Sequence, residues 1–213
     1  MSKRKNPSTP PGALADEARA RMLEDIIQCR IRPGEMVQLS DLARRYEMSK
    51  TPVREALTLL ERDGLVEPIP YKGYRIPPID EADIEDIFFM RELLEGAAVE
   101  AAAGRITEED LQRLEALEAP DTPVMTLHYD DYARTFHTII AHASGMQRLA
   151  RQVVDTYTDV RRLQYAGVGR PRPKVITQEH EEIVKALRAR DGELAKKAMV
   201  EHIRNIRLRA ESS

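Results

Sequence analysis

Apolar residues recur at helical spacing in three separate segments of the first third of the chain. The first predicted helix covers about residues 16–30, and Pro33-Gly34 ends it. A short helix is predicted over residues 41–47. After a tight turn, Ser49 or Thr51 caps a third helix, whose buried seam repeats every three or four residues.

The pattern changes after Asp63-Gly64, where two short extended runs follow at residues 65–69 and 73–77. They predict a small β-ribbon with Gly73 at its tip. Two helices joined by a tight turn and followed by a ribbon are typical of a winged helix–turn–helix, which presents its second helix to the DNA major groove. We therefore expect a DNA-binding domain over residues 13–79, preceded by a disordered basic tail at residues 1–12.

From residue 80 onward the apolar pattern is helical only, and short Gly- or Pro-containing breaks divide it. Short breaks favour antiparallel neighbours, so residues 80–213 are expected to form an all-α antiparallel bundle. The expected fold class is therefore mostly α, with the winged helix–turn–helix and its ribbon in front. The predicted helices of the bundle lie near residues 81–103, 107–118, 123–144, 146–166, 174–190 and 192–210.

Charge is distributed unevenly along a chain whose net charge is −3. Residues 1–78 carry 14 Lys and Arg against 11 Asp and Glu, whereas the remainder carries 19 against 25. This modest asymmetry agrees with a DNA-facing front and an acidic rear. The single cysteine excludes an internal disulfide, and we find neither a secretion signal nor an apolar run long enough to cross a membrane, so we expect a cytoplasmic protein.

Side chains suited to reading bases gather at the start of the third helix. Ser49, Lys50, Thr51 and Arg54 occupy its first turns, and an arginine there can bind the O6 and N7 atoms of a guanine as a fork. Cations that can contact phosphate flank this helix on both sides. They are Arg44 and Arg45 on the preceding helix and Lys72 and Arg75 in the ribbon, beside Gly73.

The segment from about Ala15 to Ile79 resembles the winged helix–turn–helix of GntR-family bacterial regulators. The resemblance implies base or phosphate contacts by Lys50, Thr51 and Arg54, and a homodimer on a pseudo-palindromic operator. We expect such a bacterial protein to be associated with the nucleoid. Lys50 stands where the family often has Arg, which keeps the charge but loses the fork. The residues that carry the resemblance are Pro33-Gly34, Leu39, Leu42-Ala43, residues 49–57, residues 63–66 and Gly73.

Three histidines of the rear half, His137, His180 and His202, lie on the apolar seams of three different predicted helices. Arg91 lies on a similar seam, and Arg161 follows Tyr157 on its own helix. Inward ionisable groups are costly unless they meet one another, a metal or a ligand. One inward histidine is usually only a hydrogen-bonded core residue, but three together, with two arginines, indicate a site for a metal or an anionic ligand. Arg91, Tyr157 and Arg161 are the candidate ligand-binding residues.

Residues 80–210 resemble, more loosely, the FCD ligand-binding domain of the FadR subfamily of GntR regulators. The resemblance rests on residues 86–103, Phe136-His137 and the surroundings of His180 and His202. It implies a divalent metal, such as zinc or nickel, held by three histidines and one Asp. The three histidines match His137, His180 and His202. The Asp position is here Ala133, and Asp130 lies a further turn away, roughly 5 Å along the axis, which makes it a poor substitute.

These features favour a DNA-binding transcription regulator, expected to be a repressor, whose operator affinity a small carboxylate controls with possible help from a metal. An alternative is an effector-independent DNA-binding dimer with a purely structural rear domain. A metal-dependent hydrolase is a third hypothesis, but none of the common catalytic motifs is present, so we expect no enzyme.

Overall fold

The computed structural model describes residues 12–118, 127–168 and 172–211. The predicted tail and the predicted start of the helix near residue 123 lie outside these ranges. The chain divides into two compact units at Ile79 and Asp80, and each is described by itself. The elements are α1 (Ala13–Ile27), β1 (Met36–Val37), α2 (Leu39–Arg45), α3 (Lys50–Arg62), β2 (Glu67–Ile69), β3 (Gly73–Arg75), α4 (Glu81–Ala103), α5 (Glu108–Glu115), α6 (Leu127–Ala143), α7 (Gln147–Tyr165), α8 (Pro173–Arg188) and α9 (Gly192–Glu211).

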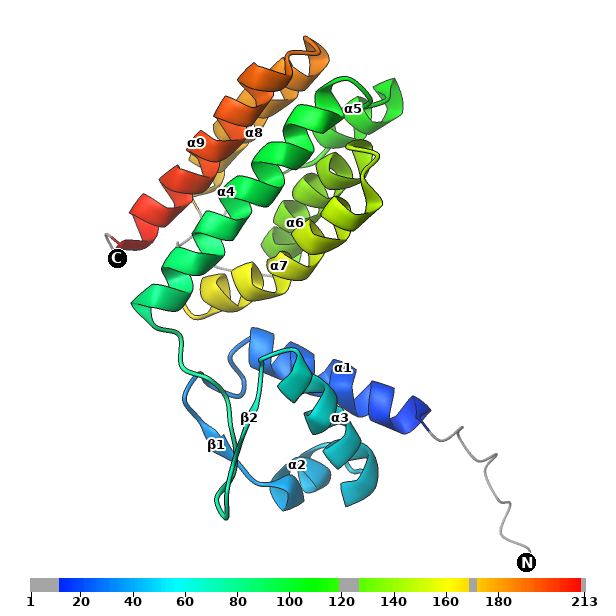
Figure 1. Ribbon diagram of the computed structural model, residues 1–213, viewed down its shortest axis with the longest axis vertical. Coiled ribbons are helices and arrows are strands. Elements are labelled where there is room, and N and C mark those ends of the chain that lie inside the picture. Colours follow the sequence, from blue (N-terminus) through cyan, green and yellow to red (C-terminus); the bar gives the residue numbers. More distant parts are fainter. Residues whose placement is uncertain (1–11, 119–126, 169–171, 212–213) are drawn as a thin grey trace, which may run out of the picture. The chain divides into compact units, whose positions relative to one another are not determined.

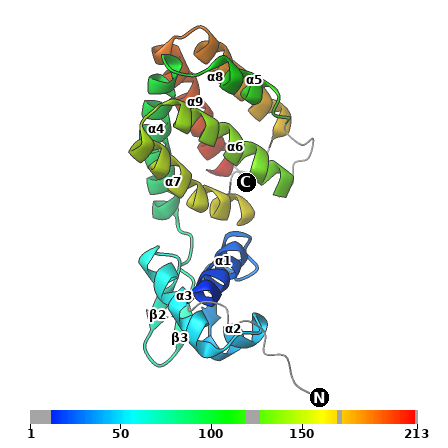
Figure 2. The same ribbon diagram turned by 90° about the vertical axis from the view of Figure 1, so that its right-hand side faces the viewer.

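The first unit is a winged helix–turn–helix (Figures 1 and 2). Helices α1 and α3 pack together over a core to which all three helices and the sheet contribute. Helix α1 begins and ends about three residues earlier than predicted, because Cys29 adopts the left-handed conformation (φ 55°) and stops the helix well before Pro33-Gly34. The predicted seam of α3 is correct, since Val53, Leu57 and Leu60 are all at most 1% exposed.

The sheet has three strands, one more than predicted. The two ribbon strands pair as expected, Glu67 with Arg75 and Ile69 with Gly73, but β1 adds to the other edge of β3 through Met36 and Val37. Gly73 therefore begins a strand and does not form the tip, as the sequence suggested. The turn consists of residues 70–72, with Tyr71 and Lys72 exposed.

Gly73 is required where the hairpin approaches β1. A Cβ atom at this position would lie 2.5 Å from the carbonyl oxygen of Val37, and the backbone φ is 98°. Changing Gly73 to Ala is expected to lower the free energy of unfolding by about 1–3 kcal/mol. Gly34→Ala is the matched control, because Gly34 has φ 81° but no atom within 4 Å of the added Cβ. Urea unfolding of both variants measures the difference, and equal losses would show that the close approach is unimportant.

The second unit is an antiparallel helical bundle around α4. Helix α4 contacts α6, α7, α8 and α9, and Figure 1 shows it between the α6–α7 pair and the α8–α9 pair. Helix α4 begins with a capping box. The Asp80 side chain accepts a hydrogen bond from the Asp83 backbone N–H, and the Asp83 side chain accepts one from the Asp80 backbone N–H. Buried along α4 are Arg91 and Glu95, so the centre of the bundle is polar. No helix among the described residues has the length and apolar character that a bilayer crossing requires.

Candidate functional site

The start of α3 forms an exposed polar face over a buried seam. Pro52 is buried in the first turn, where its missing N–H costs no hydrogen bond, while Lys50, Thr51 and Arg54 are exposed. Ser49 occupies the N-cap position with extended backbone, but its side chain makes no capping hydrogen bond. Its hydroxyl is therefore not committed to the helix and remains available to a partner.

Internal ion pairs separate the predicted DNA-binding cations into two groups. Arg45 bonds the buried carboxylate of Asp25 at 2.8 Å, and Arg75 bonds Glu67 across the ribbon at 2.6 Å. Arg44 pairs with Asp41 at 3.2 Å, but both side chains are largely exposed, and such a pair contributes little. Lys50, Arg54 and Lys72 form no ion pair with any residue in the described ranges. These three are the cations most available to DNA.

Arg45 has a structural role that the sequence did not reveal. The carboxylate of Asp25 is 8% exposed and also bonds Arg30 (Nε to Oδ1, 2.6 Å) and the hydroxyl of Tyr46 (2.8 Å). Arg45 therefore neutralises a buried charge that joins α1 to α2. Its loss would leave this charge less compensated, so its contribution to DNA binding is expected to be mainly indirect.

The structure brings His137, His180 and His202 together at the centre of the bundle. They come from α6, α8 and α9, none is more than 4% exposed, and each offers a ligand atom within 4.8 Å of those of the other two. The ring of Phe136 stacks on His180 with centroids 3.6 Å apart and 8° between the planes. We call these three residues the histidine cluster.

His180 and His202 hydrogen-bond side chains outside the histidine cluster through their Nδ1 atoms, whereas the Nδ1 atom of His137 lies close to a carboxylate without forming a hydrogen bond in the described part of the chain. Glu95 Oε2 lies 2.5 Å from His137 Nδ1, and Glu179 Oε2 lies 2.8 Å from His202 Nδ1. The hydroxyl of Tyr132 lies 2.8 Å from His180 Nδ1. In the described part of the chain, the Nε2 atoms of His180 and His202 are buried without a hydrogen-bond partner.

This arrangement fits a divalent metal. Metal-binding histidines usually direct one ring nitrogen to the ion and the other to a carboxylate or hydroxyl. Three imidazoles suit zinc or nickel and leave positions open to a further ligand. His137, His180 and His202 are the residues that would hold the ion.

Two histidines of the cluster, His180 and His202, are held in the neutral form that a metal requires. Burial lowers the pKa of His180 well below its usual value, with further contributions from His202 and His137. Burial likewise lowers the pKa of His202 to about 4, although its hydrogen bond to Glu179 acts in the opposite direction. Both rings are therefore uncharged at neutral pH, ready to donate a lone pair.

A pH dependence of stability follows for protein stripped of metal. As the pH falls from 6.5 to about 4, His202 gains a proton in the unfolded chain but not in the folded one. The free energy of unfolding therefore decreases by up to about 1.4 kcal/mol for each pH unit of acidification from this group. Urea unfolding in EDTA at pH 6.5 and 5.5 measures this loss. His202→Asn, which keeps an N–H near Glu179, should show a correspondingly shallower dependence. Identical slopes for the two proteins would contradict it.

Arg91 is a buried cation that its ion pair satisfies only in part. It is 1% exposed, and its Nε donates to Glu95 Oε1 at 2.7 Å. Burial opposes its charge, but the Glu95 carboxylate keeps the pKa of Arg91 raised. Its Nη1 and Nη2 atoms are buried and have no hydrogen-bond partner in the described part of the chain. The rings of Phe88 and Tyr157 flank the guanidinium, each with its centroid 5.7 Å away.

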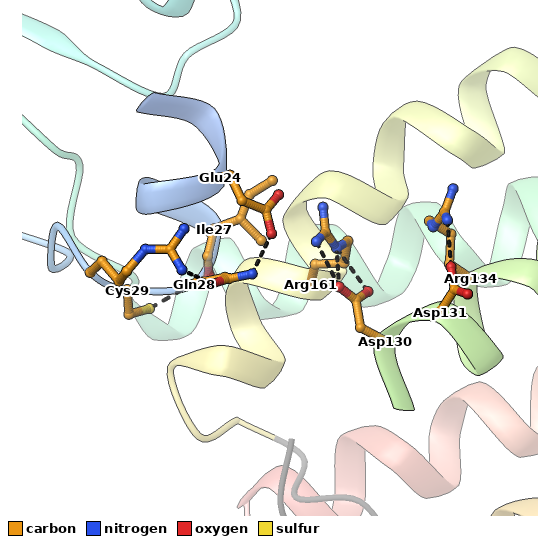
Figure 3. A network of polar contacts seen from close by, with 9 residues as sticks. Glu24, Ile27, Gln28, Cys29, Asp130, Asp131, Arg134 and Arg161 are labelled. Atoms are coloured by element: carbon orange, nitrogen blue, oxygen red, sulfur yellow. Dashed lines mark hydrogen bonds and ion pairs between the residues drawn. The ribbon is translucent and has the colours of Figure 1, made fainter. Parts of the chain in front are cut away.

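Arg161 is not available to a ligand in the way that the sequence suggested. Figure 3 shows its guanidinium facing Asp130, with Nε 2.8 and 2.7 Å from the two carboxylate oxygens and Nη2 2.6 Å from Oδ2. Asp130 is 4% exposed, so this ion pair is largely screened from solvent. Asp130 is also the side chain considered as a substitute for the missing metal ligand, and its carboxylate is occupied by this ion pair.

Two acidic residues of the site, Glu95 and Glu179, were not among the predicted metal- or ligand-binding residues. Glu95 joins Arg91 to His137, and its position one helical turn after Arg91 was the available signal. Glu179 bonds His202, Asn205 (3.0 Å) and Arg209 (2.9 Å). Burial would raise the pKa of Glu179, but the hydrogen bonds from His202 and Arg209 lower it to about 2, so it remains an anion.

A cavity of about 320 Å³ lies among α5, α6 and α8. Its inner wall includes the rings of Tyr132, Phe136 and His180, and its rim includes Lys185 and Arg188. The His180 ring of the histidine cluster therefore borders this cavity.

Comparisons with known proteins place both units in described families. Residues 86–205 match the FCD domain, and residues 14–76 match the bacterial regulatory proteins of the gntR family. The HTH-type transcriptional repressor RspR of Escherichia coli K12 is 28% identical over 187 residues, which cover 85% of this chain and 82% of RspR. The HTH-type transcriptional repressor GlaR of the same strain is 29% identical over 194 residues, covering 84% of this chain and 87% of GlaR.

The fold itself is similar to that of a protein of solved structure. E. coli McbR/YncC superposes with a TM-score of 0.75 at 22% identity, over 94% of this chain and 98% of that protein. At this identity the likeness concerns the fold alone.

Proposed function

Because this chain belongs to the gntR family of bacterial transcription regulators and carries an FCD domain, and is thus a DNA-binding regulator and not an enzyme, we propose that a small carboxylate bound in its helical unit controls its affinity for an operator. We further propose that it represses transcription, as RspR and GlaR are named for doing, and that it binds a pseudo-palindromic operator as a homodimer. The hydrolase hypothesis is set aside.

The observation that carries the proposal is the unsatisfied edge of Arg91. A buried guanidinium that leaves two nitrogen atoms without acceptors is costly, and a carboxylate that accepts from both would remove that cost. Glu95 engages the opposite edge and holds the fork in place. The aromatic rings of Phe88 and Tyr157 add an apolar wall, so an organic acid with a short carbon skeleton fits better than an inorganic anion.

The histidine cluster supports metal assistance. Glu95 contacts both Arg91 and His137, so an anion at Arg91 would lie close to the cluster. A bound divalent ion would add positive charge and an open position for a ligand oxygen at this point. Ala133 supplies no carboxylate, so we propose that the protein holds the ion with three neutral imidazoles and less tightly than a site with a fourth protein ligand.

A screen of two- to six-carbon mono- and dicarboxylates by thermal shift is expected to yield a clear stabiliser. Arg91→Lys keeps a charge beside Glu95 but loses the fork, so it should weaken the binding of that acid by at least about tenfold while preserving the fold. Isothermal calorimetry of the two proteins measures the difference. Unchanged affinity in Arg91→Lys would remove Arg91 from the site.

Two features favour the effector-independent alternative. Ala133 removes one carboxylate from the surroundings of the histidine cluster, and Asp130 engages Arg161. If no acid in the screen stabilises the metal-loaded protein while DNA binding is intact, the helical unit is better explained as a structural clamp.

A further inference from the structure

The turn of the β2–β3 hairpin carries a large aromatic side chain that contacts almost nothing. Tyr71 is 108% exposed, more than any other large hydrophobic residue in the described ranges, and its backbone φ is 62°. Bulky side chains rarely adopt this left-handed conformation, which suits Gly or Asn. Neither packing nor backbone preference accounts for a tyrosine at this position, so its use must lie outside the folded unit.

The turn holds Tyr71 in a defined direction. The Lys72 amide donates to the carbonyl of Ile69 at 3.0 Å, and Gln38 donates its Nε2 to the carbonyl of Lys72 at 2.6 Å. Next to this bond, Gly73 packs closely against the backbone of Val37. The turn is thus fastened to the segment between β1 and α2, and the ring of Tyr71 is presented outward.

The hairpin turn and the helix–turn–helix lie at the same end of the unit. Figures 1 and 2 show the loop that joins β2 to β3 extending to the end where α2 lies, and α2 leads directly into the start of α3. Lys72, adjacent to Tyr71, is exposed and forms no ion pair in the described part of the chain. A DNA duplex that meets the start of α3 in one groove would present the backbone and minor groove beside it to this turn.

We propose that Tyr71 is a DNA-contacting residue, whose ring packs against deoxyribose on the wall of the minor groove while Lys72 pairs with phosphate. A planar ring on a fixed turn buries apolar area against sugars at little cost in side-chain entropy. Apolar side chains do enter the minor groove in architectural proteins, although there they insert between base steps. The inference rests on the proposed binding of an operator by the front unit.

Fluorescence tests this contact directly, because the chain contains no tryptophan. Tyr71→Trp places a single indole at the turn, and its emission should change on titration with a 30-base-pair duplex selected from a random pool with wild-type protein. Phe89→Trp, on the exposed face of α4 in the other unit, is the control and should not respond to the duplex. An unchanged spectrum of Tyr71→Trp in a complex that forms normally would overturn the proposal.

Tyr71→Asn separates contact from folding. Asparagine tolerates a positive φ, so the melting temperature should stay the same or rise, while affinity for the selected duplex should fall at least fivefold. The slope of log affinity against log salt should stay the same in Tyr71→Asn but decrease by about one in Lys72→Ala. Wild-type affinity in Tyr71→Asn refutes the role of the ring. Failure of the wild-type protein to bind any duplex refutes instead the proposed function on which it rests.

Discussion

Replacing Arg54 with alanine is expected to weaken operator binding by about 1–3 kcal/mol, which is roughly 5- to 150-fold, and to relax base preference at one position of each half-site. Arg54 lies in the second turn of α3, is exposed, and forms no ion pair in the described ranges, so its fork is available to a guanine. Fluorescence anisotropy with the selected duplex and with single-base variants measures both effects.

Arg62 provides the matched control on the same helix. It is exposed in the last turn of α3, eight residues and about 12 Å of helix axis from Arg54. Arg62→Ala removes the same charge but should change affinity by less than about threefold and leave base preference intact. If the two variants lose affinity equally and neither relaxes base preference, Arg54 acts only through charge, and its assigned role in reading bases is wrong.

Removing the imidazole of His180 is expected to abolish metal binding. His180 supplies one of three ligand atoms, and its Nε2 is buried without a partner in the described part of the chain. A site reduced to two imidazoles should lose at least about 100-fold in affinity for zinc or nickel. Elemental analysis of purified His180→Ala and His180→Gln, with circular dichroism to verify folding, checks this expectation. His142→Ala changes an exposed histidine of α6 and should keep its metal.

The reverse change tests the effect of the missing carboxylate. Ala133 lies one turn before His137 and is 4% exposed. Ala133→Asp should tighten zinc binding by about tenfold or more, and in EDTA it should lower the melting temperature because it buries an unpaired charge. If metal has no effect on the stability of either wild type or Ala133→Asp, the histidine cluster is a structural core and not a metal site.

The helices of the bundle were predictable because their limits are local. Helix α4 covers the predicted residues 81–103, since Asp80 caps its start and Gly104 follows its end. The convergence of the three histidines was also predictable, because each lies on an apolar seam that must face the core.

Other features depend on pairings between distant residues. Strand β1 is only two residues long and has no periodicity of its own, so only its pairing with β3 defines it. The ion pair of Arg161 with Asp130 joins α7 to α6, and nothing in the spacing along either helix indicates it. Arg45 was similarly assigned to DNA because the sequence does not show that Asp25 is buried beside it. An exposed cation and an internally paired one look alike in sequence.

The most direct test of the account is the dissociation constant of metal-loaded wild-type protein for its selected duplex, measured with and without a saturating concentration of the acid that the thermal-shift screen identifies. Control by a carboxylate in the helical unit predicts a change of at least about tenfold, which corresponds to a coupling free energy of about 1.4 kcal/mol. It also predicts that Arg91→Lys binds DNA normally but needs at least about tenfold more acid for the same response. Equal dissociation constants for the wild-type protein in the two conditions would contradict the account.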